Sequence, residues 1–290
     1  MSHHVAMAQS DMPTMRSRRL GNELKRLRVE RGFKVQDIAD KLQCGQPKVS
    51  QIENGKRGIR PLDLTVLLEF YGIDDEAYIA SIRRLAKEIH KVDWWSSQGP
   101  LLHDTLRDYL TLEADSELIR EYDPSVIPGL LQTEAYMSQI FATRHPADKV
   151  VQLVKTRMKR KELLDSHLDF RLRTIIDAPV LHRISGSSAV AREQLEHLLA
   201  MDGRPNINIQ ILPLDASIPA EQYAPFTLFS LRGEPSIDVT WLEHVTGGTL
   251  LEQRTDVQAY ARVWDEFTAA ALSPSASRQY IRDRIKDSGS

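Results

Sequence analysis

The chain has 290 residues, 41% of them hydrophobic and 27% charged, which is typical of a globular protein with room for two domains. A single cysteine excludes an intrachain disulfide and a cysteine-based metal cluster, and no apolar run reaches the roughly 18 residues of a membrane span. The first residues also lack the basic and apolar blocks of a secretory signal, so we expect a cytoplasmic, nucleoid-associated protein.

The net charge of −2 conceals an uneven distribution of charge along the chain. Residues 16–60 hold thirteen Lys and Arg against five Asp and Glu, whereas residues 93–290 hold twenty-one against twenty-eight. A basic head on an acidic body indicates that the head binds a polyanion. A solvated charged face would give the same pattern, so the charge alone does not decide between the two.

Five short helices are predicted in the head, after a disordered tail over 1–15. In the first, Leu20, Leu24 and Leu27 recur at helical spacing up to a stop at Gly32. The same kind of apolar spacing, with glycine stops and Pro61 in a first turn, predicts four more helices, over 35–42, 46–54, 61–71 and 75–91. We therefore predict an all-α DNA-binding domain over 16–92, in which the second and third helices form a helix-turn-helix.

The third helix of the head carries a polar face suited to reading DNA. Helical spacing turns Val49 and Ile52 inward, which leaves uncharged hydrogen-bonding groups on the opposite face. A glutamine amide can form two hydrogen bonds with the edge of an adenine in the major groove. The residues predicted to read bases are Gln46, Pro47, Ser50 and Gln51. The residues predicted to contact phosphates around them are Lys34, Lys41, Lys48, Asn54, Lys56, Arg57 and Arg60.

The entry to this third helix departs from the usual pattern in two ways. With Gly45 as N-cap, Pro47 falls in the first turn, where a backbone N–H has no intrahelical acceptor and its loss does no harm. Gln43 stands where the tight turn favours glycine, and a left-handed conformation there would cost about 1 kcal/mol. Cys44 beside it is interpreted as a small apolar filler in preference to a redox switch.

The larger C-terminal part is predicted to be an α/β or α+β domain over 101–286, joined by a linker at 93–100 and followed by a disordered tail at 287–290. Alternating or continuous apolar runs predict strands over 170–176, 206–212, 226–231 and 237–242. Helices are predicted over 101–120, 131–166, 189–201, 255–271 and 274–286. The helix over 189–201 would link the first two of these strands as a βαβ unit.

Several motifs together carry a resemblance to a known family. The stretch "VQDIADKLQC…PKVSQIENGKRGIRPLDLTVLLEFYGI" resembles the Xre, or lambda-repressor-like, helix-turn-helix family, and within it the actinobacterial WhiJ-like regulators. The likeness continues through Trp94-Trp95, "RDYLTLEADS", "YDPSVIPGLLQTEAY", "EQLEHLL", "PFTLF" and "ALSPSAS", so that it covers roughly residues 18–286. Three residues depart from the pattern: Lys34 replaces a Thr, Gln43 a Gly and Gly45 a Ser.

The resemblance implies a transcriptional regulator whose C-terminal domain senses a ligand or binds a small partner protein, such as one encoded by a neighbouring gene. Because one such helix reads few base pairs, we expect a homodimer on pseudo-palindromic double-stranded DNA. The rigid, irregular segment 122–136 supplies the candidate contact residues, which are Tyr122, Pro124, Pro128, Gly129, Gln132 and Tyr136. The alternative is a loop that only packs into the core.

Enzymatic motifs are missing from the sequence. It has no H-E-x-x-H, G-x-S-x-G or Walker pattern, and its titratable residues near strand ends form no known constellation. We therefore expect neither an enzyme nor a bound cofactor or metal. The alternatives are that the C-terminal domain is an uncharacterised enzyme, or that the protein is an antitoxin-like component of a pair.

Overall fold

The computed structural model describes residues 13–91, 93–95, 104–166, 169–184, 187–218, 224–232 and 236–287. The chain forms two compact units, an N-terminal one that runs to Thr111 and a C-terminal one that begins at Leu112. Most of the tail predicted over 1–15, most of the linker predicted over 93–100 and most of the tail predicted over 287–290 lie outside the described residues. The domain boundaries given above stay predictions.

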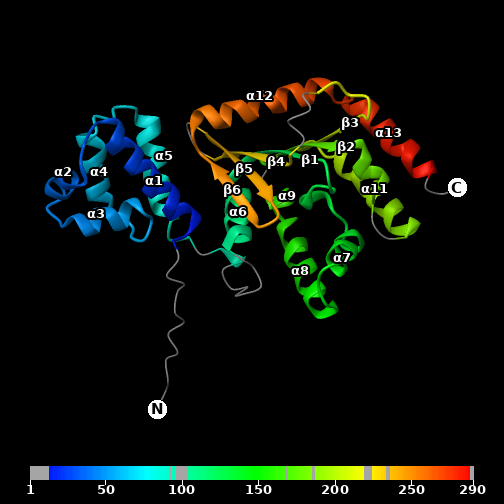
Figure 1. Cartoon of the computed structure of the whole chain (residues 1–290), viewed down its shortest axis with the longest axis horizontal. Helices are drawn as coiled ribbons and strands as arrows, with labels where there is room; N and C mark the ends of the chain where they lie inside the picture. The colour runs from blue at the N-terminus through cyan, green and yellow to red at the C-terminus, as the bar shows by residue number, and fades with distance from the viewer. Residues whose placement is uncertain are drawn as a thin grey trace, which may run out of the picture. The chain divides into compact units, whose positions relative to one another are not determined.

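The N-terminal unit contains the five predicted helices (Figure 1). Their bounds are α1 Met15–Glu30, α2 Val35–Lys41, α3 Gln46–Glu53, α4 Pro61–Phe70 and α5 Glu76–Glu88. Their apolar stripes meet in one core, in which Leu24, Ile38 and Leu64 are each 1% exposed. The first part of α6, Asp104–Asp115, also belongs to this unit. The prediction of an all-α five-helix head is confirmed.

Two glycines bring α1 into close contact with the end of α3. A Cβ atom added at Gly21 would lie 2.6 Å from the backbone oxygens of Ile52 and Glu53. Gly55, which ends the α3 turn with a φ of +69°, would place a Cβ 2.7 Å from the backbone nitrogen of Arg18. Because no side chain fits at either position, the backbone of α3 is seated directly on α1.

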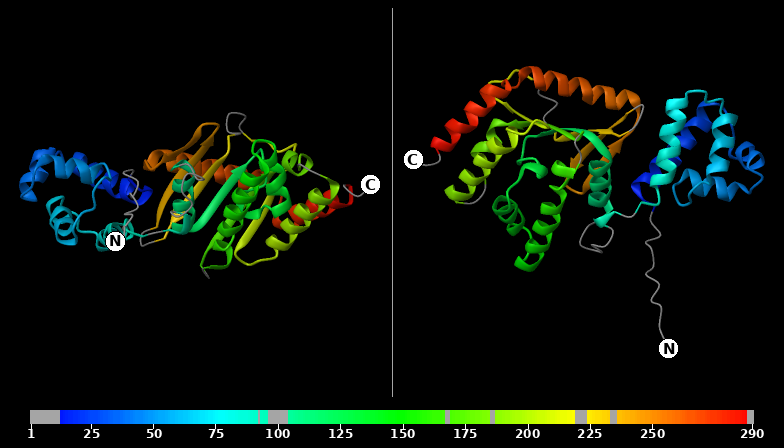
Figure 2. Two further views of the ribbon diagram at one scale, coloured as in Figure 1. Left: turned by 90° about the horizontal axis from the view of Figure 1, so that it is seen from below. Right: turned by 180° about the vertical axis from the view of Figure 1, so that it is seen from behind.

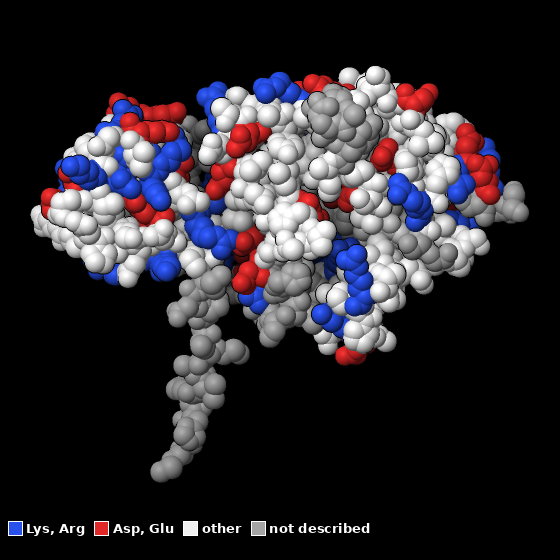
Figure 3. Space-filling model, in the orientation of Figure 1, with Lys and Arg blue, Asp and Glu red and all other residues white. Residues whose placement is uncertain are grey.

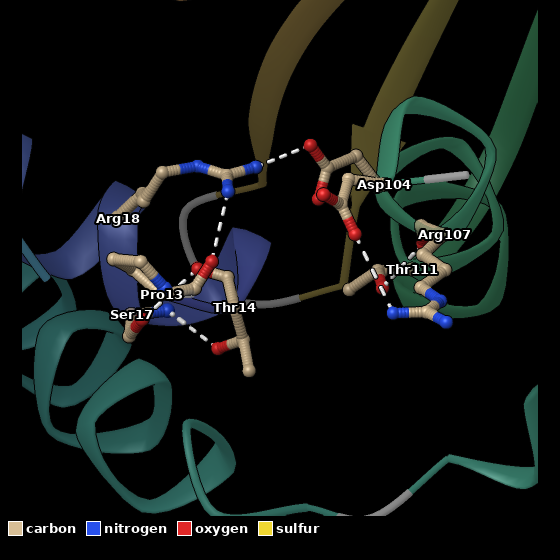
Figure 4. A network of polar contacts seen from close by, with 8 residues as sticks. Pro13, Thr14, Ser17, Arg18, Asp104, Arg107 and Thr111 are labelled. Carbon is tan, nitrogen blue, oxygen red and sulfur yellow. Dashed lines mark hydrogen bonds and ion pairs between the residues drawn. The ribbon is translucent and has the colours of Figure 1, made fainter. Parts of the chain in front are cut away.

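The first turn of α1 is held by polar contacts with later parts of the N-terminal unit. Arg16 donates to both carboxylate oxygens of Asp93, at 2.6 and 3.2 Å, and is itself 3% exposed. Arg18 donates to the carbonyl oxygen of Pro13 at 2.8 Å and pairs with Asp108 of α6 (Figure 4). The unit is therefore tied together beyond its five helices.

The C-terminal unit is built on a six-stranded mixed sheet with the strand order β3-β2-β1-β4-β5-β6. The strands are β1 Ser116–Asp123, β2 Arg171–Asp177, β3 Ile207–Leu212, β4 Phe226–Leu231, β5 Ile237–His244 and β6 Gly247–Leu251. Strands β1, β2 and β3 are parallel to one another, and the remaining pairs are antiparallel. With the head, this sheet confirms the multidomain fold and shows that its second domain is α+β.

Helices cover both faces of the sheet (Figures 1 and 2). The connection from β1 to β2 contains the 3-10 helix η2 Gly129–Leu131, α7 Glu134–Ala142, α8 Ala147–Arg160 and α9 Leu163–Ser166. The connection from β2 to β3 contains α10 Ala178–His182 and α11 Ser188–Asp202, and the chain continues after β6 with α12 Arg254–Ala270 and α13 Pro274–Asp287. Helix α12 packs on one face through Trp264 and Phe267, which share a core with Tyr122, Ile175 and Phe226.

Two sequence predictions for this unit are wrong in part. The helix predicted over 101–120 ends at Asp115, and Ser116–Asp123 is the central strand β1, because pairing with β2 and β4 overrides the helical spacing. The helix predicted over 131–166 is interrupted at Pro146, which caps α8 and cannot continue α7. The parallel β2–α11–β3 unit is confirmed.

Candidate nucleic-acid interface

The turn between α2 and α3 has the conformation that the sequence predicts. Gln43 adopts a φ of +50°, the left-handed region in which a side chain is strained. Gly45 caps α3 with an extended backbone, and Pro47 lies in the first turn of that helix. Cys44 is half-buried and packs against the core of the head. The unusual entry to α3 is therefore accommodated at the cost of one strained residue.

The outward face of α3 is exposed and uncharged. Val49 and Ile52 are 2% and 4% exposed and face the core, whereas the side chains of Gln46, Pro47, Ser50 and Gln51 are exposed. The surface over α3 is mostly free of charged side chains in Figure 3, with Lys and Arg at its margin. The structure thus brings the four predicted base-reading residues together on one accessible face, and base reading itself stays a prediction.

One of these residues is oriented by a partner that sequence reasoning missed. Gln36, in the first turn of α2, donates to Asp40 at 2.6 Å and accepts a hydrogen bond from the side-chain nitrogen of Gln46. The Gln46 oxygen and its second N–H remain available to a base edge. The signal in the sequence is weak, since only the turn geometry brings two glutamines ten residues apart into contact. Val35, Gln46, Pro47 and Ser50 line a hollow at this position.

The predicted phosphate contacts fall into two groups. Lys34, Lys56, Arg57 and Arg60 are exposed, and none of them forms an ion pair with a described residue. The other three are engaged within the head. Lys48 pairs with Asp63 at 3.0 Å, Lys41 lies 5.3 Å above the ring of Phe70, and Asn54 donates to the carbonyl oxygen of Ser50 at 2.8 Å.

A buried ion pair fixes α3 in the head. Arg28 of α1 donates to both carboxylate oxygens of Glu53, at 2.6 and 3.0 Å, and a third N–H reaches the carbonyl oxygen of Phe33 at 2.9 Å. Glu53 is 6% exposed, and its hydrogen bond raises the pKa of Arg28 above its usual value. Arg28 donates three hydrogen bonds, and both carboxylate oxygens of Glu53 accept one. The two charges therefore compensate each other inside the core, and the pair holds α3 in one orientation.

Most of the candidate contact residues of the segment 122–136 are inside the C-terminal unit. Tyr122, Gln132 and Tyr136 are 0%, 1% and 2% exposed, and Pro128 is also buried. Gln132 donates to the carbonyl oxygen of Ile127 at 2.7 Å. Pro124 and Gly129 are half-buried. The segment thus packs as a core loop in this structure, and a contact with a ligand or partner stays a prediction.

Together, the α2–turn–α3 geometry and its polar outer face define a helix-turn-helix protein with a second, larger α+β domain. The sequence of residues 19–78 matches the helix-turn-helix domain family, and residues 106–283 match the domain of unknown function DUF5753. This second match covers more than half of the chain, which therefore belongs to the DUF5753 family. No curated protein and no solved structure matches the chain.

None of the helices in the described part of the chain is both long enough and apolar enough to span a membrane. Within the same residues, no group of three or more His, Cys, Asp or Glu side chains is arranged to hold a metal ion.

Proposed function

We propose that this protein is a sequence-specific, DNA-binding transcriptional regulator of the Xre family, close to the actinobacterial WhiJ-like group. It binds double-stranded, pseudo-palindromic DNA as a homodimer, and its C-terminal domain adjusts that binding in response to a small-molecule effector or a small partner protein. The domain acts by binding and not by catalysis.

The exposed face of α3 supports this proposal best. Its amides and hydroxyl lie in a row without competing charges, and exposed cations flank it at Lys56, Arg57 and Arg60. Uncharged hydrogen-bonding groups suit base edges, and flexible cations at the margin suit phosphates. Val35 and Pro47 add apolar surface to the hollow beside Gln46, which would accept a thymine methyl group next to an adenine.

The test is selection of bound duplexes from a random pool with the full chain, followed by titration of selected and scrambled DNA. Gln46→Ala and Gln51→Ala should each weaken binding to the selected sequence by about 1–3 kcal/mol and relax the preference at one position. Gln152→Ala, which removes an exposed helical glutamine far along the chain, is the matched control. Equal losses on selected and scrambled DNA would contradict base reading by α3.

The phosphate contacts are tested separately through their salt dependence. Arg57→Ala and Arg60→Ala should weaken binding to every sequence and reduce the slope of log K against log salt by about one each. Arg144→Ala removes an exposed arginine of the C-terminal unit and should leave the slope unchanged. The selected half-sites should be about 10–10.5 base pairs apart if a dimer reads them, and a single uninterrupted site would contradict the dimer.

A non-catalytic C-terminal domain is supported by the surroundings of its histidines. The ring of His182 lies 3.2 Å from the hydroxyl of Tyr280, and that of His244 lies 3.1 and 3.3 Å from the hydroxyls of Thr246 and Thr249. The ring of a third histidine, His197, lies 3.0 Å from the Nζ atom of Lys161. Among the described residues, none of these contacts places a nucleophile, a base and an orienting group in series. Isolation of the full chain from native extract distinguishes the alternatives, since a co-purifying small protein would indicate a partner-regulated or antitoxin-like system and substrate turnover an enzyme.

A further inference from the structure

Glu121 lies on the central strand of the sheet, at the end where parallel strands terminate. Successive side chains of a strand point to opposite faces of the sheet. Tyr122 faces the core under α12, so its neighbour Glu121 points to the opposite face. In register beside it are Thr174 on β2 and Thr227 on β4. These three side chains therefore project from the same face of the sheet in an adjacent row.

The next row of side chains on this face is apolar. On the same face, Ile119 and Phe229 are 1% and 0% exposed, and Leu172, the partner of Ile119 on β2, is 1% exposed. A carboxyl group in such a place needs hydrogen-bond donors or a counter-charge. Among the described residues, Glu121 receives no hydrogen bond and no ion pair. It nevertheless keeps partial contact with solvent, because its side chain is half-buried and not sealed.

The cation whose charge acts on Glu121 already has a partner. Arg160 of α8 donates to both carboxylate oxygens of Glu113, at 3.0 and 2.8 Å, and both residues are buried. Asp123 is also committed, since its carboxylate accepts hydrogen bonds from the backbone nitrogens of Ser125 and Val126 at 2.7 and 3.2 Å. Arg160 is thus satisfied by Glu113, and Asp123 by backbone N–H groups, whereas Glu121 has no hydrogen-bond or ion-pair partner among the described residues.

Thr174 provides a second, independent observation at the same place. It is 1% exposed, and its hydroxyl oxygen is buried without a hydrogen-bond partner in the described part of the chain. An unsatisfied buried hydroxyl is disfavoured, and threonine could be replaced by valine of the same shape without that loss. Two adjacent polar groups that the described residues do not satisfy, one of them reachable from solvent, are groups with which a ligand could form hydrogen bonds.

The topology places this site where open sheets commonly bind ligands. From β1 the chain crosses to β2 and β3 on one side, and it then returns to β4 on the other side of β1. Glu121 lies near the carboxyl end of β1, beside the carboxyl end of the parallel strand β2. In open sheets with helices on both faces, ligands commonly bind at the carboxyl ends of the parallel strands.

We infer that Glu121 and Thr174 form a binding site for a small organic cation with N–H donors, of the ammonium or guanidinium type. The carboxylate supplies the counter-charge, and the threonine hydroxyl accepts one N–H. Asp123 and the exposed Glu243 add negative charge at the rim, and Trp241, in register with Thr227, adds an aromatic surface on the same face. Burial, followed by the charge of Asp123, raises the pKa of Glu121 to about 8, so a cation that pairs with the carboxylate at neutral pH releases a proton from this group.

This inference deepens the proposed function, because it gives the effector of the C-terminal domain a chemical class. The test uses the full chain without DNA and three probes: methylammonium, putrescine and agmatine, titrated by calorimetry. Saturable binding of at least one probe is expected. Tetramethylammonium, which has charge but no N–H, and butylurea, which has N–H groups but no charge, should bind at least about tenfold more weakly.

Two variants separate the site from general charge effects. Glu121→Gln should weaken probe binding about tenfold or more, and Thr174→Val should weaken it about two- to tenfold. Thr174→Val removes an unsatisfied hydroxyl, so it should fold at least as well as the original chain. Glu193→Gln changes an exposed carboxyl on α11 and serves as the matched control, which should bind normally.

The inference is overturned if none of the three probes binds saturably in the millimolar range, or if Glu121→Gln and Thr174→Val bind as well as the control. Equal binding of tetramethylammonium would also overturn it, since the N–H donors would then be irrelevant. DNA selection is a separate measurement. A chain that binds its selected DNA but no probe refutes this inference alone, and one that binds a probe but no specific DNA refutes the regulator proposal alone.

Discussion

Glu53 in the N-terminal unit and Glu121 in the C-terminal unit are both carboxylates within a packed element, but they differ in the hydrogen bonds that they receive. Glu53 is 6% exposed and receives two hydrogen bonds from Arg28. Glu121 is half-buried and receives none from the described residues. Where the chain supplies the counter-charge, the carboxylate belongs to the architecture. Where the chain does not, the charge must be satisfied by a proton, by solvent or by a bound molecule, and the residue is available for binding.

The largest expected effect comes from breaking the satisfied pair. Arg28→Ala leaves Glu53 buried without its counter-charge and should lower the free energy of unfolding of the N-terminal unit by about 3–5 kcal/mol. This free energy is measured by urea titration, with hydrogen exchange in peptides of α1 and α3 as the signal of unfolding. The double variant Arg28→Met, Glu53→Met replaces both charges with apolar groups and should recover most of the loss. If the double variant is as unstable as the single one, the pair contributes more than charge compensation.

The unsatisfied carboxylate should reveal itself in the pH dependence of stability. Its pKa is about 8 in the fold and about 4.5 in the unfolded chain, so the fold holds the proton more tightly. The free energy of unfolding of the C-terminal unit should therefore fall as the pH rises from about 4.5 through 8, by about 1.4 kcal/mol for each unit by which the two pKa values differ. Glu121→Gln should remove that part of the decline, as read from hydrogen exchange in β1. An identical pH profile in the variant would mean that Glu121 is already satisfied.

Close packing around the satisfied pair can be tested at Gly21. A methyl group there would overlap the backbone oxygens of Ile52 and Glu53, each 2.6 Å away, and would push α3 off α1. Gly21→Ala should cost about 1–3 kcal/mol of stability. It should also weaken binding to selected DNA more than to scrambled DNA, because the base-reading face moves. A stable variant with normal specificity would show that α3 is not positioned by this contact.

The smallest expected effect concerns strain in the head. Gln43 holds a φ of +50°, which glycine adopts without penalty. Gln43→Gly should raise the melting temperature of the N-terminal unit, with a gain of up to about 1 kcal/mol in the free energy of unfolding. Binding to selected DNA should stay the same, since the side chain of Gln43 is outside the α3 face. Destabilisation by this change would mean that the glutamine side chain makes compensating contacts.

The contrast between the two units also explains what the sequence could predict. The head follows local signals: leucine spacing, glycine stops and the proline at the start of α3 predict five helices and their buried faces. The strand β1 was missed because its first residues continue the helical spacing of the helix predicted over 101–120, and its identity comes only from pairing with β2 and β4.

The candidate sites show the same limit. The polar face of α3 follows from helical period alone, but the bond from Gln46 to Gln36 depends on the angle between two helices. The prolines and glycine of the segment 122–136 left two interpretations open, a contact surface and a loop that packs into the core. The structure buries Tyr122, Gln132 and Tyr136, and Tyr122 packs against α12, which lies far along the chain. Local pattern identifies which groups carry chemistry, and tertiary packing decides which of them remain accessible.

The polar contacts at the first turn of α1 affect where the chain can be cut to give an isolated helix-turn-helix domain. Arg16 and Arg18 rely on Asp93 and Asp108, which lie beyond the end of the matched helix-turn-helix segment at residue 78. A fragment cut in the linker would retain all five helices but lose the carboxylate of Asp108, and one cut at residue 78 would lose both. A fragment that keeps both contacts must therefore extend past Asp108 into α6, the helix that continues without a loop into β1.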